Sequence, residues 1–133
     1  MRLVEARTAA LIASIAVILA LTLVPTASDN DLELVPFGDL ADAVASSDDG
    51  RLLEVVLESV ANILLFAPLG AALAYAGFRA GQAAFVGISL SVGIEIVQLL
   101  LISGRTAAVD DVILNALGLM LGYAAVSRWK TAA

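Results

Sequence analysis

The sequence predicts an all-α, polytopic membrane protein: a four-transmembrane-helix bundle with an acidic extracytoplasmic loop. Of its 133 residues 61% are hydrophobic, and its mean hydropathy is +0.99, whereas only about half the residues of soluble domains are apolar. The apolar runs are continuous rather than alternating, which argues against a β-barrel and leaves helices to satisfy the backbone within lipid. We expect one domain that covers residues 1–133.

Four stretches approach the roughly 20 apolar residues that a spanning helix needs. Pro25 closes the first, and the third and fourth are joined by a short link at 104–109. The Asp- and Ser-rich stretch 41–50 is interpreted as part of a polar loop. The predicted spans are therefore 8–24, 52–77, 82–103 and 110–126.

Lysine and arginine residues predict the orientation, because short cytoplasmic loops are enriched in them. Arg51 and Arg105 fall on one side of the predicted spans, and five bases fall on the other: Arg2, Arg7, Arg79, Arg128 and Lys130. We therefore expect a multi-pass protein of the plasma membrane with both termini in the cytoplasm and the 25–51 loop outside. In an alternative interpretation residues 1–27 are a cleavable signal peptide, which would leave three spans.

Composition excludes several classes of protein. The chain has no cysteine and no histidine, so it has no disulfide framework, no Cys/His zinc site and no Ser-His or Cys-His catalytic pair. The net charge is −6, and seven acidic residues lie between Asp29 and Asp49 without a base among them. Nucleic acid is an unsuitable partner, since no basic face is available to neutralise phosphates. We expect membrane lipids as partners and no cofactor, and self-association stays open.

Polar side chains recur inside the apolar spans. Glu54, Glu58 and Asn62 follow one another at i, i+4 and i+8, so they form one stripe on a helix. In the third span Glu95 and Gln98 are neighbours at i and i+3. A carboxylate within a span needs protonation or a partner. Burying Glu95 in the membrane therefore costs more free energy than burying any other of these residues.

The fourth span begins with polar residues of its own. Asp111 and Asn115 lie at i and i+4, and Gly118 and Gly122 continue the same face, where glycines allow close helix approach. At about 1.5 Å per residue, polar groups of three spans fall about 8–12 Å below the outer helix ends. We expect a water-filled pocket there, capped by a network of Arg105 with carboxylates. The candidate binding residues are Arg105, Glu95, Asp111, Asp110, Asn115, Asn62 and Gln98, and no metal site is predicted.

Three ordered motifs resemble the VanZ-like family of membrane proteins. They are Asn62-Ile-Leu-Leu-Phe-Ala-Pro-Leu-Gly70, then Glu95-x-x-Gln98, then Arg105 followed by Asp110-Asp111-x-x-x-Asn115-x-x-Gly118. The resemblance spans residues 60–124 and implies about four helices without a cofactor. The family takes its name from an accessory protein of resistance to the glycopeptide teicoplanin. Many members place an aromatic residue and an aspartate where this chain has Ala107 and Ala108.

The leading hypothesis is a small membrane protein whose outward-facing polar pocket binds or handles an amphipathic cell-envelope molecule. A lipid head group or a lipid-linked saccharide fits this description, and a part in the response to glycopeptide-type antibiotics is a further option. Arg105 would hold an anionic head group, Glu95 and Asp111 would orient Arg105 or accept hydroxyls, and the amides would supply neutral hydrogen bonds.

Three rival hypotheses stay open. The chain could be a membrane-embedded enzyme with Glu95 or Asp111 as general base, although the lack of His and Cys weighs against an enzyme. It could be a proton-coupled transporter subunit, since an intramembrane Glu can carry protons. It could also be a structural scaffold, in which the polar groups only hold helices together.

Overall fold

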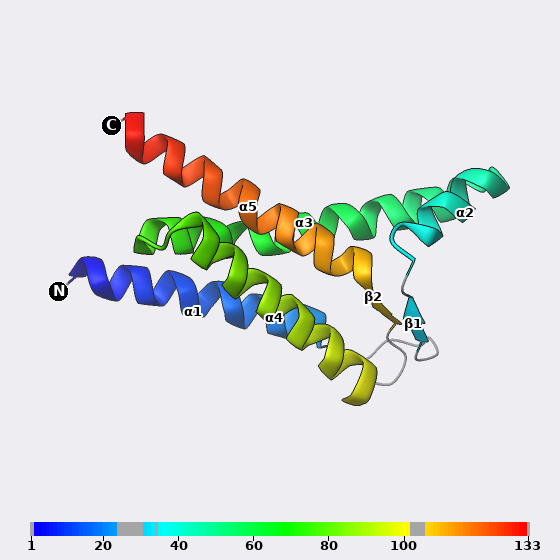
Figure 1. The fold of residues 1–133 in the computed structure, drawn as a ribbon, viewed down its shortest axis with the longest axis horizontal. Coiled ribbons are helices and arrows are strands. Elements are labelled where there is room, and N and C mark those ends of the chain that lie inside the picture. The colour runs from blue at the N-terminus through cyan, green and yellow to red at the C-terminus, as the bar shows by residue number, and fades with distance from the viewer. Residues whose placement is uncertain (1, 24–30, 34, 102–105, 133) are drawn as a thin grey trace.

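The computed structural model describes residues 2–23, 31–33, 35–101 and 106–132. Within them, five helices and two short strands follow one another along the chain (Figure 1). Both termini lie at one end of the bundle, and α2 and the strands lie at the other. In chain order the elements are α1 (Arg2–Thr22), β1 (Asp31–Glu33), α2 (Gly38–Ser46), α3 (Asp49–Ala76), α4 (Ala80–Leu101), β2 (Thr106–Ala108) and α5 (Val109–Ala132).

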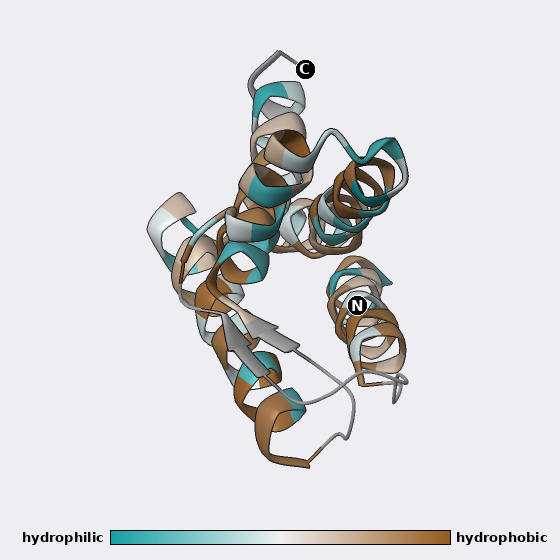
Figure 2. Ribbon diagram, turned by 90° about the vertical axis from the view of Figure 1, so that its right-hand side faces the viewer, coloured by the Kyte–Doolittle hydropathy of each residue, from teal (hydrophilic) through white to brown (hydrophobic). Residues whose placement is uncertain are grey.

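Four of these helices are long and apolar enough to cross a membrane, which confirms the predicted four-span helical bundle. Figure 2 looks along the bundle and shows many hydrophobic residues on these helices. Their ends differ from the predicted ones: α1 begins at Arg2 rather than at residue 8, and α5 continues to Ala132 rather than ending at 126. Hydropathy identifies the part within hydrocarbon, but a helix continues into the interface wherever its residues permit it.

Local chemistry determines where α3 begins and ends. The side chain of Asp48 accepts hydrogen bonds from the backbone N–H groups of Gly50 and Arg51, which caps the helix N-terminus. Gly77 ends the helix with φ of 94°, a left-handed conformation that suits glycine, so the chain turns at once into α4. Pro68 lies inside α3, and the helix continues on both sides of it.

Glycines bring α3 and α5 together. A Cβ atom on Gly118 would collide with the carbonyl of Ile63, and one on Gly122 would collide with the carbonyl of Ala67. From the other side, a Cβ on Gly70 of α3 would collide with the carbonyl of Leu119. The two backbones are therefore in direct contact, as the Gly118 and Gly122 spacing predicts. This contact fixes the middle of α5 beside the middle of α3.

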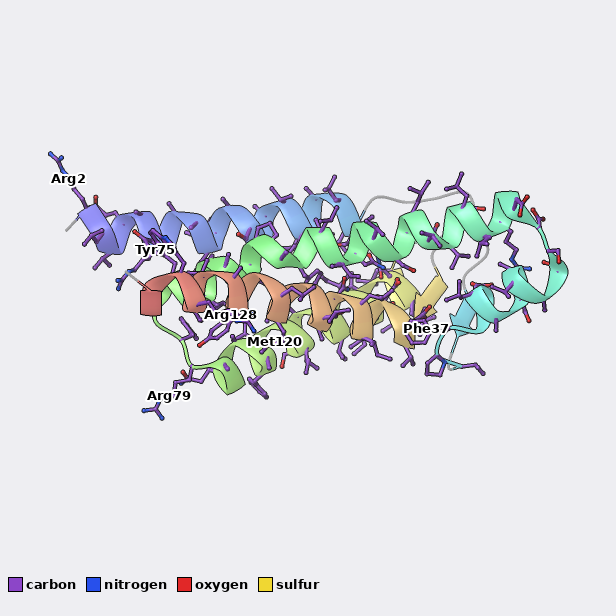
Figure 3. All side chains as sticks on the ribbon, turned by 90° about the horizontal axis from the view of Figure 1, so that it is seen from above. Arg2, Phe37, Tyr75, Arg79, Met120 and Arg128 are labelled. Carbon is purple, nitrogen blue, oxygen red and sulfur yellow. The ribbon has the colours of Figure 1, made fainter. Side chains whose placement is uncertain are left out.

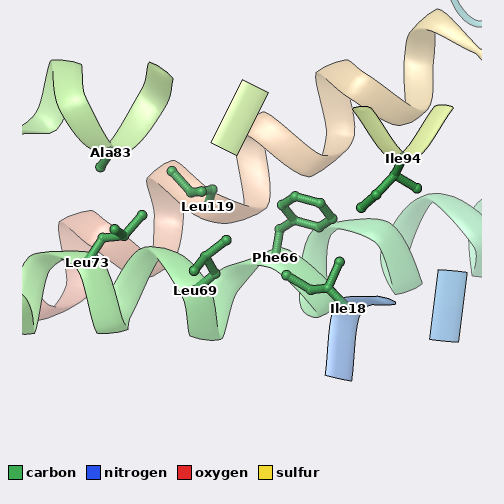
Figure 4. Close-up of a cluster of buried hydrophobic side chains, with 7 residues drawn as sticks. All are labelled: Ile18, Phe66, Leu69, Leu73, Ala83, Ile94 and Leu119. Atoms are coloured by element: carbon green, nitrogen blue, oxygen red, sulfur yellow. The ribbon is translucent and has the colours of Figure 1, made fainter. Parts of the chain in front are cut away.

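An apolar cluster holds the four long helices together (Figure 4). Phe66 and Leu69 of α3, Leu119 of α5 and Ile18 of α1 are all fully buried. The remaining members are Leu73, Ala83 and Ile94. Because Leu73 and Ala83 lie near the link between α3 and α4, the cluster occupies the half of the bundle toward the termini. The other half is where the polar residues lie.

The segment interpreted as a polar loop contains further structure. Residues 38–46 form α2, which packs against α3 and buries Ala43, and Asp39 of α2 forms a salt bridge of 2.7 Å with Arg51. The strand β1 pairs in parallel with β2, with Leu32 opposite Ala107. The pairing connects the segment after α1 to the link between α4 and α5. Neither α2 nor the strand pair was predicted.

The helix α3 is longer than the other spans. Its 28 residues extend about 42 Å, more than the roughly 30 Å of a hydrocarbon core. Asn62 lies beside Asp111 near the start of α5, so residues 49–61 continue about 20 Å past that point. Figure 1 shows this outer part of α3 together with α2 projecting beyond the rest of the bundle.

Candidate functional site

A polar cavity of about 660 Å³ lies between the halves of α1, α3, α4 and α5 that are farthest from the termini. Exposed Glu54 and Glu58 are part of its wall, so it reaches the molecular surface. The apolar cluster of Figure 4 lies on the side of the cavity that faces the termini. Its lining residues are Leu21, Thr22, Asp39, Glu54, Val55, Glu58, Ser59, Ala61, Asn62, Leu65, Ile94, Glu95, Gln98, Ala108, Asp110, Asp111, Leu114 and Asn115.

The first polar contact in the cavity joins α3 to α5. Asn62 donates a hydrogen bond from Nδ2 to Oδ1 of Asp111 at 2.5 Å. The direction of this bond is fixed, because an ionised carboxylate only accepts. Asn62 follows Glu54 and Glu58 on the same face of α3, and all three line the cavity. The i, i+4, i+8 stripe therefore faces this cavity over its whole length.

Two further amides join α4 to its neighbours. Gln98 donates from Nε2 to the backbone carbonyl of Thr22 at 2.8 Å, which holds the last turn of α1 against α4. Asn115 of α5 donates from Nδ2 to Oγ of Ser91 at 2.9 Å. Both amide side chains are buried, with 5% of Gln98 and 3% of Asn115 exposed. These contacts position the helices around the cavity.

Glu95 is held by the backbone of the link between α4 and α5. Its Oε2 accepts a hydrogen bond from the N–H of Ala108 at 3.1 Å, and only 9% of the residue is exposed. Ala108 is the last residue of β2 and lines the cavity, so Glu95 connects the strand pair to the cavity wall. Ala108 thus contributes to the site through its backbone.

Three buried acceptor atoms on the cavity wall have no hydrogen-bond partner. They are Oε1 of Gln98, Oδ1 of Asp110 and Oδ1 of Asn115. A buried polar atom without a partner costs about 1–3 kcal/mol, so such atoms are rare in native proteins. In each of the two amides the N–H group meets protein while the oxygen is left without a protein partner.

Charge in the cavity is of one sign among the described residues. The lining contains no Lys or Arg there, and it contains six carboxylates: Asp39, Glu54, Glu58, Glu95, Asp110 and Asp111. The described residues include no group of three acidic side chains placed to hold a metal ion. The carboxylates are spread along the wall rather than gathered at one point.

Six of the seven candidate residues from the sequence line this one cavity: Asn62, Glu95, Gln98, Asp110, Asp111 and Asn115. Arg105, the seventh, lies outside the described residues. Sequence reasoning missed Thr22, Asp39 and Ser59 of the lining. It also missed Ser91, which accepts the hydrogen bond of Asn115. Ser91 carried a weak signal, since it lies one turn before Glu95 on the same face of α4.

The chain matches the VanZ/LLP1 protein family over residues 9–130. It therefore belongs to the VanZ/LLP1 family. The match confirms the resemblance drawn from the three motifs, and it covers all four long helices. Neither the comparison with curated proteins nor that with solved structures gives a match.

The family motifs of this VanZ/LLP1 protein meet in space. The segment 62–70 supplies Asn62 to the cavity, Phe66 to the apolar cluster and Gly70 to the contact with α5. Glu95 and Gln98 face the same cavity from α4. The motif that starts α5 supplies Asp111 and Asn115 to the cavity and Gly118 to the helix contact.

Proposed function

We propose that this VanZ/LLP1 protein binds an amphipathic molecule of the cell envelope, with the polar head in the cavity and the apolar part in the surrounding lipid. The observation that carries the proposal is the set of buried, unpartnered acceptors on the cavity wall. A purely structural polar cluster would satisfy its own members, because each unmet atom lowers stability. These oxygens support a role in binding.

The position of the cavity supports an amphipathic ligand. The long helices around it carry exposed apolar side chains, such as Leu64 of α3, Leu101 of α4 and Ile113 of α5. In a bilayer these surfaces contact acyl chains, while the cavity opens where head groups lie. If the predicted orientation holds, the site faces the outside and meets envelope molecules directly.

The apolar cluster argues against a transport path through the bundle. Beyond Ser91 the described residues that are buried toward the termini are apolar, with Phe66, Leu69 and Leu119 fully enclosed. An ion or proton relay needs polar groups or water along its course. For an enzyme that uses a metal, the described carboxylates lack the grouping that a divalent cation requires.

The test is native mass spectrometry of the protein released from its own membrane. Asn115→Leu removes a buried cavity amide, and Gln82→Leu makes a similar change at an exposed position of α4 outside the cavity. We expect wild type and Gln82→Leu to retain one bound molecule of defined mass. We expect Asn115→Leu to lose most of it.

The proposal fails if wild type carries no bound molecule, or if Asn115→Leu carries as much as wild type. Thermal unfolding in the same detergent shows whether Asn115→Leu is folded. If it is not, Asp110→Asn replaces it, since that change keeps the shape of a half-buried cavity residue and removes its charge.

A further inference from the structure

Among the described residues, each amide side chain of the cavity donates a hydrogen bond within the protein. The Asn62 amide donates to Asp111, the Gln98 amide to the carbonyl of Thr22, and the backbone N–H of Ala108 to Glu95. A carboxylate and a backbone carbonyl only accept, so the orientations of Asn62 and Gln98 are fixed by their partners. Asn115 donates to Oγ of Ser91, a hydroxyl that can itself donate as well as accept.

Among the described residues that line the cavity, the unmet buried side-chain atoms are all acceptors. Oε1 of Gln98 and Oδ1 of Asn115 belong to residues that are more than nine-tenths buried, and Asp110, whose Oδ1 is the third such atom, lines the same cavity. A ligand that satisfies them must donate hydrogen bonds. A ligand that only accepts, such as an ester carbonyl or an unprotonated phosphate oxygen, leaves all three unmet.

We infer that the cavity recognises a primary ammonium group, carried by the head group of the amphipathic molecule. This inference rests on the proposed function. A primary ammonium has three N–H donors and one positive charge, which match three unmet acceptors and a wall rich in carboxylates. Asp110 supplies both an acceptor and a charge, and the two buried amides supply neutral acceptors that select for N–H donation.

A positive charge on the ligand would not by itself satisfy the unmet oxygens on the cavity wall. A quaternary ammonium has the same charge but no N–H, so it would leave the oxygens of Gln98 and Asn115 unpaired. A glycerol head group donates through hydroxyls but has no positive charge to meet the carboxylates. Three lipids with identical chains therefore separate the contributions: phosphatidylethanolamine, phosphatidylcholine and phosphatidylglycerol.

The experiment is a native mass spectrometry titration of the delipidated protein with each of these lipids. We expect phosphatidylethanolamine to bind about tenfold more tightly than either of the others, because it alone of the three combines N–H donors with a positive charge. Gln98→Met and Asp110→Asn should each reduce this preference severalfold. Gln82→Met, the same substitution outside the cavity, should keep it.

The outcomes separate the two proposals. Equal binding of the three lipids, if it is lost in Asn115→Leu, would support the proposed function and overturn the ammonium inference. Tighter binding of phosphatidylcholine or phosphatidylglycerol than of phosphatidylethanolamine would have the same two consequences. Free ethanolamine should compete with phosphatidylethanolamine at millimolar concentration. If ethanolamine binds at the cavity while no lipid does, the ammonium inference holds and the amphipathic ligand is wrong. If neither binds, both fail.

Discussion

Asn62 and Asp111 form the contact on which the cavity geometry depends. The donor and acceptor atoms lie 2.5 Å apart and come from residues 49 positions apart in the chain. Hydrogen bonds between membrane helices average about 0.6 kcal/mol and reach about 1.7 kcal/mol. A carboxylate acceptor places this bond toward the upper part of that range, because charge-assisted bonds are stronger than neutral ones.

We therefore predict a measurable coupling between these two side chains. In a double-mutant cycle of Asn62→Ala and Asp111→Ala, the two changes together should cost about 1 kcal/mol less than the sum of the single costs. Unfolding in mixed detergent micelles measures each free energy. The control cycle pairs Asn62→Ala with Ser91→Ala, which belongs to a different hydrogen bond, and should be additive within about 0.5 kcal/mol. Additivity in the first cycle would show that the contact contributes nothing.

Spacing made most cavity residues predictable, and the exceptions have a physical reason. Asn62, Glu95 and Asn115 stand out because an amide or carboxylate within an apolar span needs a partner. Ser91 and Thr22 do not stand out, since a hydroxyl on a helix can bond the carbonyl one turn back. Thr22 makes that bond with Ile18, and the carbonyl of Thr22 meets Gln98. Sequence indicates which groups need partners, but the fold determines which groups provide them.

At the scale of elements, the contact between α3 and α5 sets the width of the cavity. Gly118→Ala places a Cβ against the Ile63 carbonyl, and a backbone atom cannot move aside as a side chain can. We predict a loss of about 2–3 kcal/mol in the free energy of unfolding. Gly93→Ala in α4 meets nothing within 4 Å and should be neutral or slightly stabilising, because alanine favours helix. Equal effects of the two changes on thermal unfolding would contradict the close contact.

The elements that sequence missed are short and depend on distant partners. The helix α2 has nine residues, fewer than the roughly 12–15 that make a helix stable alone. Its support is packing against α3 and the Arg51 contact with Asp39. The strands β1 and β2 have three residues each. Each is a strand only because its backbone pairs with the other. The four long helices were predictable because hydrophobic length alone specifies a span.

At the scale of the whole molecule, the bundle is polar at one end and basic at the other. The cavity, α2 and the strand pair share one end. Arg2 and Arg79 lie at the other end with both termini, as Figure 3 shows. Arg7 also lies on that side, over the ring of Tyr75 at 5.5 Å from its centroid. This asymmetry agrees with an orientation in which the basic end stays in the cytoplasm.

The absence of cysteine from the sequence makes the orientation directly testable. Ser46→Cys places a thiol at the exposed end of α2, and Ala80→Cys places one at the exposed start of α4, with every base retained. Because the sequence predicts five bases on one side of the membrane and two on the other, we predict that a membrane-impermeant maleimide labels Ser46→Cys in intact cells. Ala80→Cys should react only after the cells are permeabilised, and the cysteine-free parent gives the background. The reverse pattern would place the cavity toward the cytoplasm, where a ligand would come from the inner leaflet.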